Sequence, residues 1–478
     1  MGKKQLIGIY VVMFVLITAS YNVIPDISIT IGIFFSFFSF FLFCKQRERI
    51  VEINSIYLRP VHLFLISYLI VFFQKPLDYV WGYSPRPSGI GGVDNMSTCV
   101  YFSVVGLLLF FVGYLITDWS RSLLDFSNYT YVKRKYTASP LPFCVISTLL
   151  IVVVYITTPM AVLMGGYGSD FTAGGNLVNY LLSWTNTFII TSLIQHALCR
   201  MDGRSKGITL WQYIKDIGWW QNFNIILYSI TILNIGDRGP LIIIAVAYYI
   251  VYVLESGIAP PKKLMILIII LSTVFFTILG FTKKLRDNNT VFDRLAQVDE
   301  VEEAETTNTF SPNTAELAAS YQCLSYSIYC VPRLENFKYG GYQFAYIWGA
   351  IPFGSRLLKT AGTSSSQITY FIQGPYPTHG NGSSCLADLY LDGGFIAIVI
   401  GMFCFGVIIR KIEYEMFCNK EVSLFWLCLG VYIGAHSVYI PRAMLLFFIK
   451  YALWMFVIIK IYNRDAEGYF YSSPLRIK

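Results

Sequence analysis

Two short turns of the chain set an arginine beside proline or glycine, a combination suited to binding phosphate groups. The first turn contains Asp237, Arg238 and Gly239 directly before Pro240, and the second ends on Arg442. Glycine and proline suit the ends of helices, where free backbone N–H groups attract anions. A guanidinium at such a place can bind a diphosphate through two hydrogen bonds. Anchoring of a hairpin at the lipid headgroups is the alternative.

Three side chains able to accept a proton from a sugar hydroxyl lie close together in the sequence. His379 belongs to a loop rich in glycine, asparagine and serine, and Asp388 and Asp392 follow it toward an apolar window. Each is a candidate general base where its geometry and pKa suit proton transfer. A plain turn before a membrane span is the alternative interpretation of Asp392 and the glycines after it.

His436 and Tyr390 are candidates for contact with a substrate. His436 lies just over one turn before Pro441 at membrane depth, where an ionisable side chain is costly and therefore suggests function. A hydrogen bond to a neighbouring helix is its alternative role. Tyr390 is one of several aromatic residues around the polar loop, which can stack on sugar rings or simply mark a membrane interface.

The elements that position these residues are predicted to be membrane helices. Hydrophobic residues form 55% of the chain and charged residues only 13%, against about 25% charged residues in soluble domains. A window of about 20 apolar residues crosses a bilayer. We predict an all-α polytopic membrane protein with about twelve spans: 5–24, 27–44, 58–74, 97–117, 141–158, 177–197, 217–235, 240–254, 264–282, 393–409, 423–440 and 443–462.

Basic residues indicate the orientation of these spans. With both termini in the cytoplasm, most lysines and arginines fall in cytoplasmic segments, and the short outer loops hold only Lys75, Arg86, Arg238 and Arg442. This is the distribution that the positive-inside rule requires. The formal charge of +8 is therefore interpreted as membrane orientation, and no nucleic-acid partner is expected.

The predicted spans divide the chain into three parts. Residues 1–282 hold the first nine spans, 283–392 form one large extracytoplasmic loop, and 393–478 hold the last three spans with a cytoplasmic tail. Within the loop, apolar residues recur with helical spacing and predict an amphipathic helix on the outer leaflet or over a cavity mouth: Leu317, Tyr321, Leu324 and Ile328. Residues 344–353 are apolar but too short to span, so we expect an interfacial or re-entrant segment.

Several kinds of chemistry are not indicated. The sequence contains no Walker A, HExxH or GxSxG motif and no acidic cluster with the spacing of metal ligands, so no metal and no cofactor are expected. Its ten cysteines form no CxxC pair, which gives no support to a zinc or redox site.

Three of these stretches resemble the O-antigen polysaccharide polymerase (Wzy) family. They are the Gly-Asp-Arg-Gly-Pro-Leu turn at 236–241, the segment 383–395 and the Pro441-Arg442 turn. The resemblance implies a GT-C-like helical glycosyltransferase of the bacterial cytoplasmic membrane. It would transfer a growing glycan from undecaprenyl diphosphate to a new lipid-linked repeat unit. Arg238 would bind the donor diphosphate and Arg442 would stabilise the departing charge.

The resemblance also implies a chain-length regulator and a flippase as partners, and it leaves two other functions open. An O-antigen ligase would share the topology, the large outer loop and the arginines. A flippase or transporter of lipid-linked oligosaccharides would show short loops throughout and charges within spans, where Lys450 stands nearly alone. The repeated RX10G loop pattern of some relatives is not evident. Whether the product is O-antigen, capsule or exopolysaccharide stays open.

Overall fold

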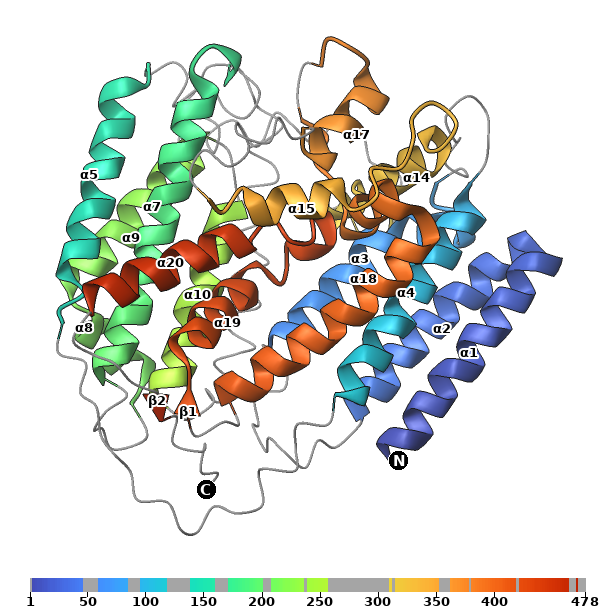
Figure 1. Ribbon diagram of the computed structural model, residues 1–478, viewed down its shortest axis with the longest axis horizontal. Coiled ribbons are helices and arrows are strands. Elements are labelled where there is room, and N and C mark those ends of the chain that lie inside the picture. The colour runs from blue at the N-terminus through green and yellow to red at the C-terminus, as the bar shows by residue number, and fades with distance from the viewer. Residues whose placement is uncertain are drawn as a thin grey trace.

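The structure, a computed structural model, is built almost wholly of helices. Figure 1 shows long helices standing side by side beneath a layer of shorter ones. We call the end at which α3 finishes and α4 begins the upper end. The residues that the structure describes are 2–45, 59–84, 95–117, 138–159, 171–200, 208–235, 239–256, 309–311, 314–351, 362–377, 380–417, 421–463 and 470–471.

One group of helices comes from the start of the chain. It contains α1 (Lys3–Val23), α2 (Pro25–Lys45), α3 (Pro60–Val80) and α4 (Met96–Ile116). α18 (Cys385–Phe417) packs closely against α4. A side chain at Gly406 of α18 would overlap the Phe110 carbonyl oxygen of α4. Small residues allow this close approach, which favours helix association in membranes.

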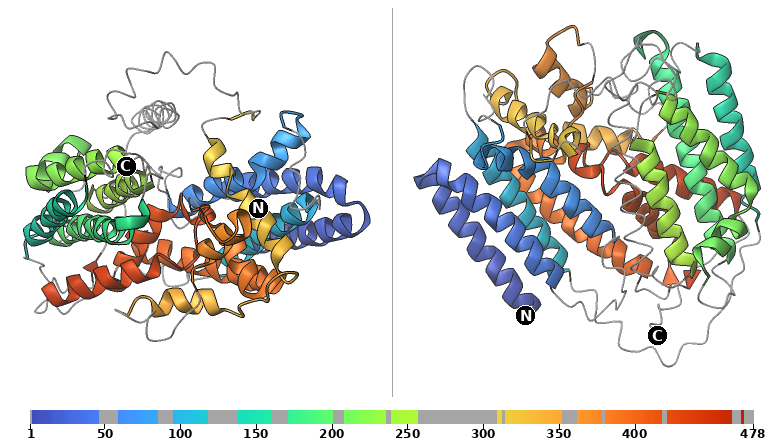
Figure 2. Two further views of the ribbon diagram at one scale, coloured as in Figure 1. Left: turned by 90° about the horizontal axis from the view of Figure 1, so that it is seen from above. Right: turned by 180° about the vertical axis from the view of Figure 1, so that it is seen from behind.

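A second group stands on the other side when the molecule is viewed from above (Figure 2). It contains α5 (Leu141–Thr157), α7 (Phe171–Arg200), α8 (Leu210–Ile217), α9 (Trp219–Ile235) and α10 (Gly239–Ser256). Buried polar side chains join α5, α7 and α9. Thr148 donates a hydrogen bond of 2.6 Å to Asn224, and Ser192 donates one to Gln221. Such bonds between apolar helices specify their pairing in lipid.

A buried carboxylate ties three helices of the first group at their lower ends. Glu413 of α18 accepts hydrogen bonds from Tyr114 of α4 at 2.6 Å and from the Val61 backbone of α3 at 3.1 Å. The Arg59 guanidinium lies 3.3 Å from the same carboxylate. Burying a charge without partners is costly. These donors replace the water that the Glu413 carboxylate loses on burial.

The last helices differ from ordinary spans. α18 bends where Gly394 adopts a positive φ of 64°, a conformation that favours glycine. α19 (Leu424–His436) stops short, and the chain then continues through turns and the 3-10 helix η6 (Ile440–Arg442) to α20 (Ile449–Tyr462). Two short strands, β1 (Glu421–Val422) and β2 (Phe470–Tyr471), pair antiparallel.

Short helices form the upper layer. They are α13 (Ala315–Ala318), α14 (Tyr321–Cys330), α15 (Gly341–Trp348) and α17 (Ser364–Gln373). The single amphipathic helix predicted from Leu317 onward is thus two helices, because the chain turns at Ser320. Tyr321 and Leu324 are buried in the main core, so this segment packs on the tops of α3, α4 and α18. α15 occupies the predicted interfacial segment.

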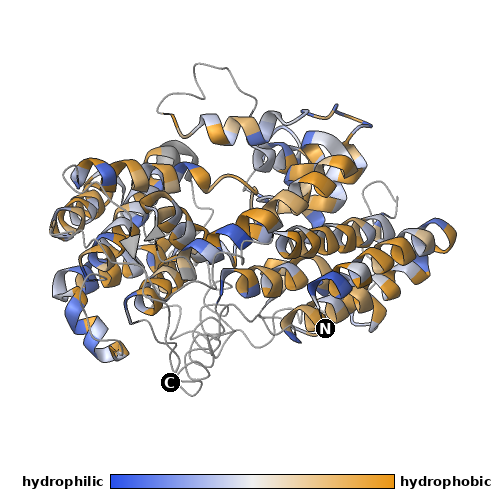
Figure 3. Cartoon of the chain, turned by 60° about the horizontal axis from the view of Figure 1, so that its bottom comes forward, coloured by the Kyte–Doolittle hydropathy of each residue, from blue (hydrophilic) through white to orange (hydrophobic). Residues whose placement is uncertain are grey.

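The long helices of the structure are apolar, as the predicted membrane spans require. Among the described residues, seven helices are long and apolar enough to cross a membrane, and α5 and α19 are shorter apolar helices. Apolar colour dominates the long helices in Figure 3. The predicted span 264–282 lies outside the described residues. The predicted spans 423–440 and 443–462 are represented by α19 and α20, which end and begin well inside those limits.

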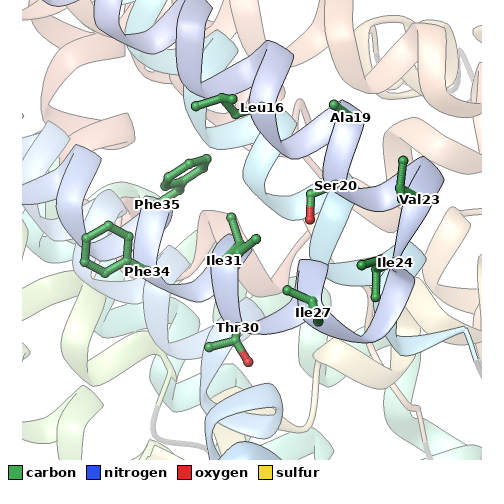
Figure 4. A pocket seen from close by; sticks show the side chains of 10 residues that line it. All are labelled: Leu16, Ala19, Ser20, Val23, Ile24, Ile27, Thr30, Ile31, Phe34 and Phe35. Atoms are coloured by element: carbon green, nitrogen blue, oxygen red, sulfur yellow. The ribbon is translucent and has the colours of Figure 1, made fainter.

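A hollow of about 800 Å³ lies on the hairpin of α1 and α2 (Figure 4). It is lined by apolar residues and two hydroxyls: Leu16, Ala19, Ser20, Val23, Ile24, Ile27, Thr30, Ile31, Phe34 and Phe35. It therefore offers no charge to a polar ligand.

The close approach of α4 and α18 predicts the effect of Gly406→Val. The added side chain meets backbone that cannot move aside, so we expect a loss of about 1–3 kcal/mol of stability, measured as a lower melting temperature in detergent. Gly8→Val in α1 is the matched control, because a Cβ there meets nothing within 4 Å. Equal melting temperatures for the two variants would contradict this packing.

Candidate functional site

Part of the predicted site lies outside the described residues. Asp237 and Arg238 belong to residues 236–238, and His379 to 378–379, none of which the structure describes. Gly239 is the first residue of α10. In the sequence, Arg238 thus falls between the upper end of α9, which finishes at Ile235, and the upper end of α10.

The chain between α19 and α20 is irregular at membrane depth. Ser67, the eighth residue of α3, donates a hydrogen bond of 2.5 Å to the carbonyl of Val438. The segment 437–448 therefore begins beside the middle of a long apolar helix rather than at its end. Backbone without regular hydrogen bonds is tolerated at this depth only where protein buries it or where it lines a polar cavity. We call residues 437–448 the interruption.

Arg442 closes the 3-10 helix within this interruption. Its side chain is 29% exposed, and its Nη1 lies 3.9 Å from a carboxylate oxygen of Glu316 in α13. The guanidinium also lies 5.9 Å from the ring centre of Tyr439. A partly exposed ion pair at this distance is weak, so the guanidinium can exchange this partner for a stronger anion.

His436 ends α19 directly before the interruption. Its ring lies 4.1 Å from the ring centre of Tyr432, and its Nδ1 lies 2.9 Å from the Tyr432 carbonyl oxygen. Because a carbonyl only accepts, Nδ1 carries the hydrogen, and Nε2 of the neutral ring is then an acceptor. No described residue forms a hydrogen bond with Nε2. Nε2 can therefore accept a hydrogen bond or a proton from a bound group.

Asp388 joins three elements at the upper end of α18. It is fully buried. Its Oδ1 accepts from the Tyr346 hydroxyl at 3.0 Å, and its Oδ2 accepts from the Gln343 amide at 2.6 Å and from the Leu445 backbone at 2.9 Å. Its partners therefore lie in α15 and in the interruption. With both oxygens occupied, the geometry favours a positioning role for Asp388 over proton transfer.

Asp392 fixes the start of α15. Its two oxygens accept from the backbone N–H groups of Tyr342 and Gln343, each at 3.0 Å. A carboxylate at a helix N-terminus satisfies free donors and interacts favourably with the dipole. Tyr390 is also buried, and its hydroxyl donates to the Val331 carbonyl at 3.2 Å. Both residues thus serve the upper layer, and roles in contact with a substrate remain predictions for them.

Gln343 and Tyr346 were not among the predicted site residues. Burial and the neighbouring Asp388 charge raise the pKa of the Tyr346 hydroxyl well above its usual range, so it stays a donor. The same hydroxyl contacts Ser364 of α17, with 3.0 Å between the two oxygens. Gln343 and Tyr346 are three residues apart in a short apolar segment, so they lie on one face of a helix. This spacing was a sequence signal that one face of α15 carries polar groups.

The arrangement combines a cation with a proton acceptor at one break in the membrane helices. Arg442 and His436 lie at the break, and Asp388 and Asp392 hold the elements around it. Within the described ranges, no group of three or more potential metal ligands occurs. At this break, Arg442 can bind an anion and His436 can accept a proton.

Comparison with known proteins gives one match. The family model described as O-antigen polysaccharide polymerase Wzy matches residues 6–462. No curated protein and no solved structure matches the chain.

The contacts of Asp388 predict that Asp388→Asn destabilises the protein by about 1–3 kcal/mol, because the new amide faces donors that then lack an acceptor. The measurement is thermal unfolding in detergent, together with the rate of tryptic cleavage after Arg442, which should rise. Tyr346→Phe removes only one donor and should have a smaller effect. An Asp388→Asn protein that is inactive but as stable as wild type would indicate a catalytic role instead.

Proposed function

The chain belongs to the O-antigen polysaccharide polymerase Wzy family and so polymerises oligosaccharide repeat units, and we propose that it does so at the interruption between α19 and α20. The observation that carries this proposal is that His436 ends α19 directly before the break in the membrane helices and Arg442 lies within it. Members of this family act on lipid-linked oligosaccharides in a membrane. The interruption rises from beside the middle of α3 to the upper layer, where Arg442 faces Glu316 of α13 and can meet a diphosphate at headgroup depth.

The proposed reaction is a displacement at the anomeric carbon of the donor glycan. A hydroxyl of the acceptor repeat unit forms the new C–O bond, while the bond between that carbon and the undecaprenyl diphosphate oxygen breaks. The hydroxyl proton passes to Nε2 of His436. Arg442 neutralises the charge that develops on the leaving diphosphate, and Arg238, which lies outside the described residues, is the second cation predicted from the sequence. Such preorganised charge is commonly the largest catalytic contribution.

We assign a positioning role to the two buried aspartates. Asp388 and Asp392 fix α15 and the interruption, so donor and acceptor meet a site whose geometry is already set. A diphosphate is itself a good leaving group, so the proposal requires cations and alignment rather than strong acid catalysis. The hollow on α1 and α2 contains no charged residue and is not part of the proposed site.

The orientation follows from the same proposal. Basic residues such as Lys45 and Arg410 lie toward the lower ends of the helices, which by the positive-inside rule face the cytoplasm. The upper layer and the interruption then face the periplasm. Substrate delivery by a flippase and length control by a regulator would take place at that face.

The function is tested by the surface glycans of cells that lack this gene. We expect the ladder of polymer lengths to collapse to a single attached repeat unit and to return with the wild-type gene. Arg238→Ala should fail to restore it at normal protein abundance, and Arg238→Lys should restore it only partly, because an ammonium lacks the planar fork. Long polymer that stays on its lipid carrier would indicate a ligase, and repeat units that never cross the membrane would indicate a flippase.

Arg442→Ala should lower the polymerisation rate of the purified protein by about 10²–10³-fold, the usual effect of removing one charge-stabilising donor. Glu316→Gln is the matched control, because it removes the ion pair of Arg442 but keeps the guanidinium. We expect it to retain most of the activity. If both variants lose activity equally, Arg442 acts through its ion pair with Glu316 and not on the substrate.

A further inference from the structure

A second cation stands near the interruption, at the start of α20. The ammonium of Lys450 lies 4.1 Å from the ring centre of Phe447 and 4.7 Å from that of Tyr451. Among the described residues, no carboxylate forms an ion pair with it; the ion pairs there involve other residues. A lysine at membrane depth is costly, and natural proteins retain one mainly for function or for anchoring. Lys450 therefore has cation–π contacts but no described counter-charge.

Aromatic contacts connect Lys450 with the proposed site. Tyr451 lies 5.8 Å from Tyr432, measured between ring centres, and Tyr432 lies 4.1 Å from His436. On the other side, Phe447 meets Tyr346 of α15 edge to face at 6.3 Å. Lys450 thus connects through Tyr451 and Tyr432 to His436, and through Phe447 to Tyr346 of α15.

Further along the helix, the face of α20 that carries Lys450 is apolar. Trp454, Val457 and Ile461 follow at four, seven and eleven residues, which places them on one face of a helix. Val457 is 47% exposed and Ile461 is 68% exposed. In a membrane protein such exposed apolar side chains face lipid tails. We call Trp454, Val457 and Ile461 the α20 stripe.

The end of this stripe near α15 is fixed in place. Trp454 stacks on Trp184 of α7 with 4.5 Å between ring centres, and its Nε1 donates a hydrogen bond of 2.7 Å to the carbonyl of Ala350, just after α15. Figure 1 shows α20 starting beside one end of α15 and running away from it at a shallow slope. The stripe therefore extends along α20 away from α15, with Lys450 at the end near α15.

We propose that Lys450 is the residue that first receives the diphosphate of the lipid-linked substrate, while the isoprenoid tail lies along the α20 stripe. This inference rests on the proposed function. A polyprenyl diphosphate must keep its tail in the bilayer while its charged head reaches the site. A cation at one end of an exposed apolar stripe meets both requirements, and no described partner has to be displaced from it.

Lys450 is thus a binding residue and takes no part in bond making. Its removal should weaken substrate binding and raise KM, while kcat at saturating substrate stays within about threefold of wild type. Arg442, which acts on the leaving group, should show the opposite pattern. This contrast separates the two cations within one assay.

The experiment measures retention of undecaprenyl diphosphate by the full-length protein in nanodiscs of neutral phosphatidylcholine. Lys450→Met should raise the Kd at least about tenfold, and Lys450→Arg should stay within about threefold. Lys460→Met is the matched control, because Lys460 also lies over a ring of α20, that of Phe456 at 5.7 Å, but near the lower end of the helix. It should bind as wild type does.

Three results would overturn the inference. They are wild-type binding by Lys450→Met, an equal loss in Lys460→Met, or displacement of the diphosphate from the wild-type protein by equimolar phosphatidylglycerol. The last result would make Lys450 a general anchor for anionic headgroups. Failure of the proposed function gives a different outcome, since the wild-type protein would then neither retain undecaprenyl diphosphate nor restore a polymer ladder.

Discussion

The buried carboxylate of Asp388 is the interaction on which the upper half of this protein depends. It accepts hydrogen bonds from Gln343 and Tyr346 of α15 and from the backbone of Leu445 in the interruption. A buried charge is stable only when its oxygens are satisfied, so these partners cannot separate without a large cost. Asp388 therefore connects α15 to the interruption, which carries Arg442.

This coupling explains how the membrane tolerates a broken helix. Backbone that leaves the helical pattern in lipid must find its hydrogen bonds elsewhere. Ser67 of α3 supplies one to Val438, and Asp388 supplies another to Leu445. The interruption is consequently held in place from two sides. Arg442 can then be presented on irregular backbone without loss of order, directly after the helix end that carries His436.

The polar residues near the site divide into two kinds. Asp388, Asp392 and Tyr390 have their polar atoms engaged within the protein, so they position other elements. His436 keeps an acceptor nitrogen, and Arg442 keeps a weakly paired guanidinium. Lys450 holds its ammonium over aromatic rings. This second group can bind a diphosphate and accept a proton, which is the chemistry that we propose for substrate binding and transfer. The acidic residues supply the rigidity that these groups need.

The amino-acid sequence determined that the chain forms apolar helices of a membrane protein, and it supplied Arg238 and Arg442 as predicted cations. Apolar windows locate helices because a membrane span must satisfy its own backbone, a local requirement. Arg238 and Arg442 were found from adjacent glycine and proline. The roles of Asp388 and Asp392 depended on tertiary structure, because their partners lie 42 to 57 residues away in the sequence. The contact that accommodates the irregular backbone after α19, from Ser67 of α3 to the Val438 carbonyl, likewise joins residues far apart in the sequence.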